Sequence, residues 1–338
     1  VERVINLEKE AHVNSAVFLS GGVDSSVMAY LLKDVEGFHL ASPEEKYAKY
    51  VAEFLGIKIN IKEYTESVSF DDLLKTYSKS SGDASASSPI PLMVSKLISD
   101  SGFKVAFSAN GADELFFGYN RTPVPGLVAK NTPATWYEPK NFETENEQIL
   151  HIFRDLGAFE IPKMGRNPSQ TVLMKSYSLR SISNDFPKCA KNRWFEVQTY
   201  LQGDLNPTLD FSSMAASLEV RVPFLNHELI EAALSHDSNE MLSCDYGRKT
   251  PLKKMLKKRG FNPSLWSRHK LGFSVKDDIL KKRDKSLNLH LDELKKRGMF
   301  NFTNLLSIGA RDKIYLKSAA HALNIWMREW VDSGKVVL

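Results

Sequence analysis

The chain has 338 residues, a length that suggests about two domains or one large one. Hydrophobic residues make up 42% and charged residues 25% of the chain, and no apolar run reaches the length of about 18 residues that a transmembrane helix needs. The formal net charge of +4 is unevenly distributed, because residues 248–297 carry 17 basic and 5 acidic side chains. Such a basic block is most often a solvated helical face, but it could also surround a polyphosphate or follow a nucleic acid.

The two cysteines, Cys189 and Cys244, are far apart and neither belongs to a CxxC pair. This spacing argues against a zinc site or a disulfide framework and fits a reducing compartment. Residues 1–12 are charged and lack an apolar core, so they do not have the pattern of a secretory signal. We therefore expect a cytoplasmic protein that does not associate with membranes.

Short apolar runs alternate with helical periodicity in the first part of the chain. The runs predict strands at 16–19, 38–41, 57–61 and 104–108. The periodicity predicts helices between them: one carries Val27 through Val35 on its apolar face, and the others span 47–55, 71–78 and 89–98. This alternation predicts an α/β fold with a doubly wound parallel sheet, in which ligands bind at the carboxyl ends of the strands.

The turn after the first predicted strand reads SGGVDSS at residues 20–26. A strand that turns through two glycines into a helix forms a nest of N–H groups at the positive end of the helix dipole, which suits an oligophosphate. Ser20, Ser25 and Ser26 add hydroxyl donors, and Asp24 can hold a divalent cation against the phosphates. No lysine follows the glycines, so this is not the loop of phosphoryl-transfer enzymes. The alternative is an ordinary glycine turn that caps a helix.

A second turn of small residues follows the fourth predicted strand, where residues 108–119 read SANGADELFFGY. Asp113 could bring a second carboxylate to a cation held by Asp24, and so balance the charge of pyrophosphate. The alternative is that Asp113 and Glu114 only cap a helix that starts at Leu115.

The later part of the chain has mainly helical periodicity, after an irregular proline-rich connection at 121–139. Helices are predicted at 227–234, 252–258 and 314–331. The last of them places five apolar side chains on one stripe, for which we expect a core role: Leu316, Ala320, Leu323, Met327 and Trp330.

Four stretches in order resemble signatures of the asparagine synthetase family. Residues 20–26 resemble the SGGxDS loop of the PP-loop ATP pyrophosphatases, the class to which the family's synthetase domain belongs, and residues 108–119 resemble its SGxGxDExFxGY signature. Residues 210–225, DFSSMAASLEVRVPFL, are similar to its DxxSMAxSLExRVPFLD stretch, and RHKLGF at 268–273 resembles R-x-K-x-GF. The resemblance implies a HUP-like PP-loop part at 1–125 and a helical substrate-pocket part at 126–338, together one synthetase domain.

The resemblance also implies roles for individual residues. It makes Asp24, Asn110, Asp113 and Lys270 catalytic and gives Mg²⁺ the ligands Asp24 and Asp113. The ammonium of Lys270 would stabilise the negative charge that builds up on the α phosphate. ATP and pyrophosphate binding falls to the residues of the strand-end turns, with Lys270 added from the fourth motif: Leu19, Ser20, Gly21, Gly22, Asp24, Ser25, Ser26, Leu40, Ser108, Ala109, Gly111 and Lys270.

The chain departs from the family pattern at Asn110, where an acidic residue is usual. Asparagine cannot act as a general base, although it could orient an amine or an acyl-adenylate carbonyl. The first loop begins only at Ser20, which leaves no room before it for the family's glutaminase domain. Nitrogen is therefore expected from free ammonia, a separate glutaminase subunit or an amine on the substrate. Glu219 and Arg221 are expected to form a buried pair rather than to act in catalysis.

The expected function is an ATP-dependent carbon–nitrogen ligase that forms AMP. The carboxylate of a small molecule or peptide would attack the α phosphate, pyrophosphate would leave, and ammonia or an amine would displace AMP. Two alternatives stay open. One is a PP-loop enzyme that modifies nucleic-acid bases and uses the basic block of residues 248–297. The other is a nucleotide-binding homologue without turnover, which Asn110 suggests.

Overall fold

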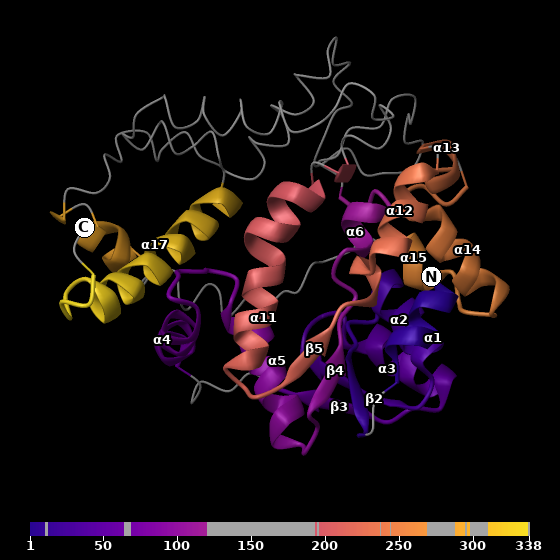
Figure 1. The fold of residues 1–338 in the computed structure, drawn as a ribbon, viewed down its shortest axis with the longest axis horizontal. Helices are drawn as coiled ribbons and strands as arrows, with labels where there is room; N and C mark the ends of the chain where they lie inside the picture. The colour runs from indigo at the N-terminus through magenta and orange to yellow at the C-terminus, as the bar shows by residue number, and fades with distance from the viewer. Residues whose placement is uncertain are drawn as a thin grey trace, which may run out of the picture. The chain divides into compact units, whose positions relative to one another are not determined.

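The computed structural model describes most of the first third of the chain and separate stretches of the rest (Figure 1). The described residues are 1–10, 13–63, 69–119, 193–194, 196–236, 238–243, 245–268, 288–294, 296–297 and 310–336. Both cysteines, the proline-rich connection at 121–139, and Lys270 with the rest of the motif at 269–273 lie outside them.

The chain forms two compact units that interleave in sequence. The sheet unit consists of Val1–Ala109, Asp204–Pro223 and Phe261–Leu338. The helical unit consists of Asn110–Gly203 and Phe224–Gly260. The division at residue 125 that the sequence suggested stays a prediction.

The centre of the sheet unit is a five-stranded parallel sheet in the order β3-β2-β1-β4-β5, which confirms the predicted doubly wound α/β fold. Its strands are β1 (Ser15–Phe18), β2 (Val35–Leu40), β3 (Ile59–Lys62), β4 (Val105–Phe107) and β5 (Glu219–Arg221). The chain moves outward from β1 to β2 and β3 on one side and continues to β4 and β5 on the other. The order therefore reverses between β1 and β4, and ligands of such sheets bind at that point, outside the carboxyl ends of the strands. Val17 pairs with Phe107, so the turns that follow β1 and β4 start beside each other.

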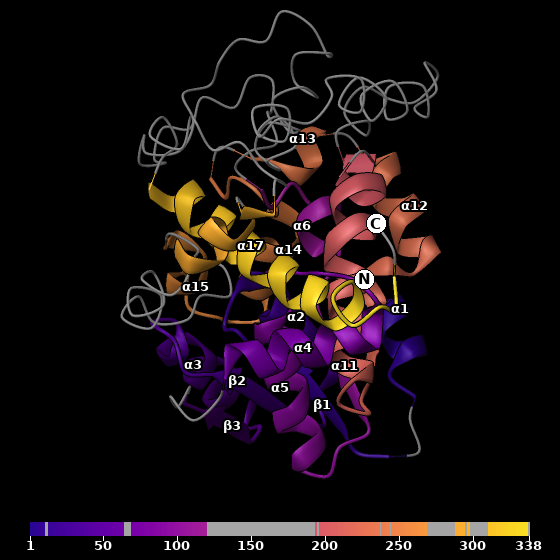
Figure 2. The ribbon, with the colours of Figure 1, turned by 90° about the vertical axis from the view of Figure 1, so that its left-hand side faces the viewer.

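Helices cover both faces of this sheet (Figure 1). One face carries α1 (Glu2–Glu8), α2 (Val23–Leu32) and α3 (Glu45–Leu55), and the other carries α5 (Pro89–Asp100) and α11 (Asn206–Met214). An outer layer on the second side consists of α4 (Phe70–Ser81) and α17 (Ala310–Trp330), which lie in front in Figure 2. The indole N–H of Trp330 donates to the hydroxyl of Ser78 at 3.0 Å and joins these two helices.

The core between the sheet and the second helical face consists of side chains from alternate strand positions. Phe18, Phe38 and Leu40 pack there against apolar residues of α5 and α11. The rings of Phe38 and Phe103 meet edge to face at 5.3 Å. All residues of β1 are buried, as expected of a central parallel strand covered on both faces.

Three members of the apolar stripe predicted on the last helix have the expected core role, whereas Trp330 is only partly buried and lies outside the core cluster. Ala320 and Met327 are buried against Leu291 and Leu294, and Leu323 packs at the edge of this cluster. This packing accounts for the apolar stripe on α17, the last helix of the sheet unit.

Two predictions were wrong, one about where a helix ends and one about the burial of an ion pair. The helix expected to include Val35 ends at Leu32, because Lys33 adopts a left-handed backbone conformation (φ 62°) and Val35 begins β2. Glu219 and Arg221 do form an ion pair, with 2.7 Å between Oε1 and Nε, but their side chains are 58% and 29% exposed rather than buried. Arg221 also donates to the carbonyl oxygens of Glu8 and Glu10, so it ties β5 to the segment that follows α1.

The helical unit contains α6 (Ala112–Leu115), α12 (His227–Ser235), α13 (Ser238–Met241) and α14 (Thr250–Lys258). Its described part centres on Arg193, whose side chain is fully buried. The guanidinium donates to the carbonyl oxygens of Leu115, Ala233 and His236. These carbonyls lie at the ends of α6 and α12, where the backbone has no helical partner, so one side chain satisfies both helix ends. Within the described part of the chain, no helix has the length and apolarity needed to cross a membrane.

Candidate active site

The turn after β1 has the backbone that the sequence predicted for a phosphate-binding loop. Gly21 has φ +71°, Gly22 is extended, and α2 begins at Val23. A Cβ atom on Gly21 would overlap the backbone nitrogen of Ala48 and lie 2.5 Å from the carbonyl carbon of Tyr47. Only glycine fits here, because a side chain would have to displace the backbone of α3.

The serine side chains of the turn form hydrogen bonds with one another and with the turn backbone. The hydroxyls of Ser20 and Ser25 are 3.0 Å apart, and Ser20 Oγ also accepts the N–H of Gly22 at 3.3 Å. Ser26 is fully buried and donates its hydroxyl hydrogen to the carbonyl of Gly22 at 2.7 Å. These bonds shape the turn without a ligand, and the contacts of the three hydroxyls with phosphate stay predictions.

Asp24 lies in the first turn of α2, where the helix dipole favours a negative charge, and its side chain is only 7% exposed. A buried carboxylate beside such a turn fits Mg²⁺, which usually takes one or two protein carboxylates and completes its shell with phosphate oxygens and water. The described residues contain no cluster of three or more His, Cys, Asp or Glu side chains that could hold a metal by themselves.

A buried histidine, which sequence reasoning missed, joins the carboxyl ends of β1 and β2. His39 Nδ1 lies 2.9 Å from the carbonyl oxygen of Leu19, and Nε2 lies 3.2 Å from the hydroxyl of Ser42. Because a carbonyl can only accept, Nδ1 carries the proton and Nε2 of the neutral ring accepts from Ser42. The only signal in the sequence was a polar residue inside an apolar strand.

The predicted nucleotide contacts of Leu19 and Leu40 involve backbone that already takes part in sheet pairing. The N–H of Leu19 donates to the carbonyl oxygen of Phe38, and Leu40 pairs with Lys62 of β3.

His39 should make folding stability depend on pH. Burial lowers its pKa, although the bond to Leu19 and the charge of Glu45 act in the opposite direction. The unfolded chain then takes up the proton first, so the free energy of unfolding is fully kept above about pH 6.5 and falls as the pH drops below it. We expect His39→Gln to flatten this pH dependence in urea unfolding curves. The exposed His227→Gln serves as the matched control, and an unchanged slope in His39→Gln would contradict the assignment.

The turn after β4 divides between the two units. Ser108 is buried, and its N–H donates to the carbonyl of Arg221 in β5 at 2.9 Å. Ser108 and Ala109 thus lie in the sheet unit at the switch point, with Leu19 and the turn at 20–26. Asn110, Gly111 and Asp113 belong to the helical unit, and shared Mg²⁺ binding by Asp24 and Asp113 stays a prediction.

Gly111 immediately precedes α6 and has φ +92°, and a Cβ atom there would overlap the side chain of Leu225. The helix starts at Ala112, so the alternative of a helix that starts at Leu115 and is capped by Asp113 and Glu114 was wrong. Both acidic residues lie in the first turn of α6 instead.

Asp113 is half-buried and forms an ion pair that the sequence did not indicate. Its carboxylate oxygen Oδ1 binds the ammonium of Lys249, which is 5% exposed. The N–H of Lys249 also donates to the carbonyl of Phe116 at 3.0 Å. Gly118 packs directly on the pair, and a Cβ atom there would collide with both side chains. Lys249 belongs to the basic block of residues 248–297, but it is not part of a solvated face.

The neighbouring Glu114 is 2% exposed and accepts a hydrogen bond from the hydroxyl of Tyr119 at 2.5 Å. Burial, together with the charge of Asp113, raises the pKa of Glu114 to about 7. This carboxyl group is therefore partly protonated at neutral pH.

The sequence profile of the asparagine synthase family matches residues 2–331, which is nearly the whole chain. The chain belongs to the asparagine synthase family. Its membership confirms the resemblance carried by the four motifs and supports an ATP-dependent, ligase-like function.

Curated relatives of the chain include three proteins with related names. One is glutamine-hydrolyzing asparagine synthetase 1 of Bacillus subtilis, 25% identical over 313 residues that cover 80% of this chain and 48% of the relative. Proteins provisionally named as glutamine-hydrolyzing asparagine synthetases occur in Methanocaldococcus jannaschii (26% identical, covering 70% of this chain and 34% of the relative) and Mycobacterium tuberculosis H37Rv (26% identical, covering 66% and 39%). The chain thus spans about half the length of these relatives or less.

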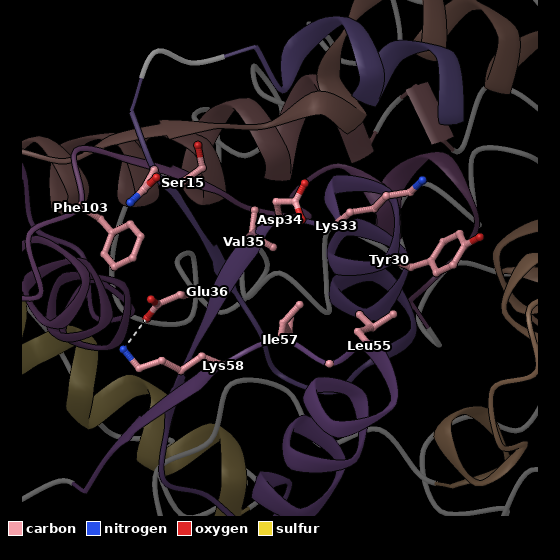
Figure 3. Close-up of a pocket in the computed structure, with 12 residues that line it drawn as sticks. Ser15, Tyr30, Lys33, Asp34, Val35, Glu36, Leu55, Ile57, Lys58 and Phe103 are labelled. Atoms are coloured by element: carbon pink, nitrogen blue, oxygen red, sulfur yellow. Dashed lines mark ion pairs between the residues drawn. The ribbon is translucent and has the colours of Figure 1, made fainter.

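A cavity of about 500 Å³ lies at the amino ends of the strands, opposite the end of the sheet where the turn of residues 20–26 lies. Figure 3 shows Ser15 and Phe103 on one side and Tyr30 and Lys33 on the other. Glu36 and Lys58 form an ion pair of 2.9 Å within it. The residues that line it include none of the predicted nucleotide-binding residues that the structure describes, of which Leu19 and Leu40 lie at the carboxyl ends of β1 and β2.

Proposed function

We propose that the chain adenylates a substrate carboxylate at the turn of residues 20–26 and then transfers the acyl group to ammonia or another amine. The observation that carries this proposal is the position of the turn. A glycine turn with a buried carboxylate, Asp24, follows the central strand β1 at the sheet's switch point, in a chain of the asparagine synthase family.

The proposed roles follow from the chemistry of each group. N–H groups at Gly21 and Gly22 bind the pyrophosphate part of ATP, and the ammonium of Lys270 stabilises negative charge on the α phosphate. Asp24 is the Mg²⁺ ligand of the sheet unit and Asp113 that of the helical unit. The Asp113 carboxylate would hold the metal while it is also paired with Lys249. When bound, Mg²⁺ supplies positive charge that helps pyrophosphate to leave.

Asn110 acts in the second step under this proposal. An amide cannot accept the proton of the attacking amine, but it can hold the amine or the acyl carbonyl by a hydrogen bond. We expect Asn110→Ala to keep exchange of pyrophosphate into ATP and to slow amide formation about 10-fold, the cost of one lost hydrogen bond. Asn14→Ala, at the opposite edge of the sheet, is the control. A parallel loss of both activities in Asn110→Ala would contradict a role confined to the second step.

The decisive experiment incubates the protein with Mg-ATP and a panel of amino acids, small carboxylic acids and peptides, with and without ammonia, while AMP and pyrophosphate are measured. Exchange of labelled pyrophosphate into ATP without an amine would demonstrate adenylation. ATP binding without exchange for any acid would instead support the nucleotide-binding homologue without turnover.

A nucleic-acid-modifying enzyme is the weaker alternative, because the chain belongs to the asparagine synthase family. In the described part of the basic block, Lys249 is buried and Arg268 half-buried in ion pairs, whereas Lys254, Lys257, Lys258, Arg259 and Lys296 are exposed. Oligonucleotide binding with a steep dependence on salt would support that alternative, and no binding at low salt would remove it.

A further inference from the structure

Arg268, the first residue of the RHKLGF motif, is half-buried and lies against the amino end of α3. Its guanidinium forms an ion pair with Glu44 through Nη1, and the two side chains are 12% and 8% exposed. The guanidinium carbon lies 3.9 Å from the centre of the Tyr47 ring. Glu44 precedes the first residue of α3 and Tyr47 lies in its first turn, so Arg268 has two contacts at one helix end.

The other arm of the guanidinium reaches the phosphate-binding turn. Nη2 of Arg268 donates to the carbonyl oxygen of Gly21 at 3.2 Å. Gly21 itself packs on the backbone of Tyr47 and Ala48 so tightly that no side chain fits. The turn, the amino end of α3 and Arg268 therefore form one contact group within the sheet unit.

The bond to Gly21 matters because the carbonyl of Gly21 and the N–H of Gly22 belong to the same planar peptide group. In a trans peptide the C=O and N–H point in opposite directions, so holding the oxygen also sets the direction of the N–H. Ser20 Oγ accepts that N–H at 3.3 Å on the other side. Glycine at φ +71° has little steric preference of its own, and a rotated peptide would turn its carbonyl oxygen toward a bound phosphate and repel it.

We propose that Arg268 is a positioning residue that fixes the Gly21–Gly22 peptide in the orientation that binds pyrophosphate. The inference rests on the proposed function, because it assigns the turn to a nucleotide. It adds a role for the arginine of the motif, which acts through the turn and not through the substrate.

A guanidinium is suited to this task in a way that an ammonium is not. Its planar fork bonds Glu44 with one arm and Gly21 with the other while its face stacks on Tyr47. Lysine keeps the charge opposite Glu44 but cannot make all three contacts. Arg268→Lys therefore separates loss of orientation from loss of the ion pair.

The test compares Arg268→Lys and Arg268→Gln with Arg297→Lys and Arg297→Gln in the full chain. Arg297 is the matched control, because it also bonds carboxylates of the sheet unit, Glu293 and Asp332, but on its surface. We expect Arg268→Lys to weaken Mg-ATP binding about 10-fold in calorimetry and to raise the KM for ATP similarly in the exchange assay. The KM for the carboxylic acid and the Tm should stay near those of the wild type. A role in folding alone would lower the Tm and leave ATP affinity unchanged at temperatures where the variant is folded.

Failure of this inference can be told from failure of the proposed function. If the wild type exchanges pyrophosphate and Arg268→Lys matches Arg297→Lys in ATP affinity, the positioning role is overturned and adenylation stands. If the wild type binds Mg-ATP without exchange and Arg268→Lys weakens that binding, adenylation fails and the positioning role stands. If the wild type does not bind Mg-ATP at all, both fail. Should Arg268→Gln not fold, Glu44→Gln gives a second measurement, and its effect should not add to that of Arg268→Lys.

Discussion

Asp24→Asn is expected to lower Mg-ATP-dependent pyrophosphate release by at least about 100-fold, the usual cost of removing a group that stabilises transition-state charge. The substitution keeps the shape of a side chain that is only 7% exposed, but it removes the negative charge that would hold Mg²⁺. The measurement is initial-rate release of pyrophosphate with the best acid of the panel, together with exchange of pyrophosphate into ATP.

Asp34→Asn provides the control for this prediction. Asp34 follows the other end of the same helix, is exposed, and lines the cavity at the amino ends of the strands. Its substitution should leave the rate within about twofold, since it changes the same charge far from the turn. Equal rates in wild type and Asp24→Asn would refute the assignment of the site.

Gly21→Ala should be the most destabilising single substitution in the turn of residues 20–26. An alanine there must adopt φ +71° and must also displace the backbone of α3 at Tyr47 and Ala48. We expect a loss of about 3 kcal/mol or more in the free energy of unfolding, from left-handed strain and overpacking together. Exchange activity should be lost as well, because the peptide held by Arg268 would move.

Gly56→Ala separates these two causes. Gly56 ends α3 with φ +65°, close to the value at Gly21, but a Cβ atom there meets nothing within 4 Å. Its substitution should cost only about 1 kcal/mol and leave exchange intact. Urea unfolding of both variants measures the difference, and equal losses would show that backbone strain alone explains the effect at Gly21.

The sequence predicted the parts of the fold that depend on local patterns. Alternation of apolar runs and helical periodicity was enough for β1 to β4 and for the helices between them. The helix predicted at 47–55 ended at the right residue, because Gly56, which follows it, adopts the left-handed conformation that commonly ends a helix. At Val35 the same reasoning failed, because Lys33 takes a positive φ without being glycine, and the apolar periodicity runs on past it.

The fifth strand could not have been predicted in this way. β5 has only three residues and follows a helix far along the chain from β4. Its pairing of Val105 with Glu219 and of Phe107 with Arg221 depends on a tertiary contact that no local window contains. The Glu219–Arg221 pair is exposed because β5 lies at one edge of the sheet.

For the candidate site, the sequence by itself was enough to predict a chemistry. Two glycines and an aspartate between a strand and a helix, followed by ordered matches to one family, pointed to ATP and to pyrophosphate as the leaving group. They did so because the backbone geometry that such a turn requires is available to few residue types. Asn110 marked the step at which the expected general base is missing.

The tertiary structure alone decided which side chains contact the predicted site residues. His39 behind Leu19, Lys249 on Asp113 and Arg268 between Gly21 and Glu44 are polar groups whose partners lie from 20 to 247 positions away in sequence. Sequence patterns record periodicity and local conformation, whereas the pairing of buried polar groups depends on which distant segments the fold brings into contact. Turn residues could therefore be named from the sequence, but the residues that hold the turn in place could not.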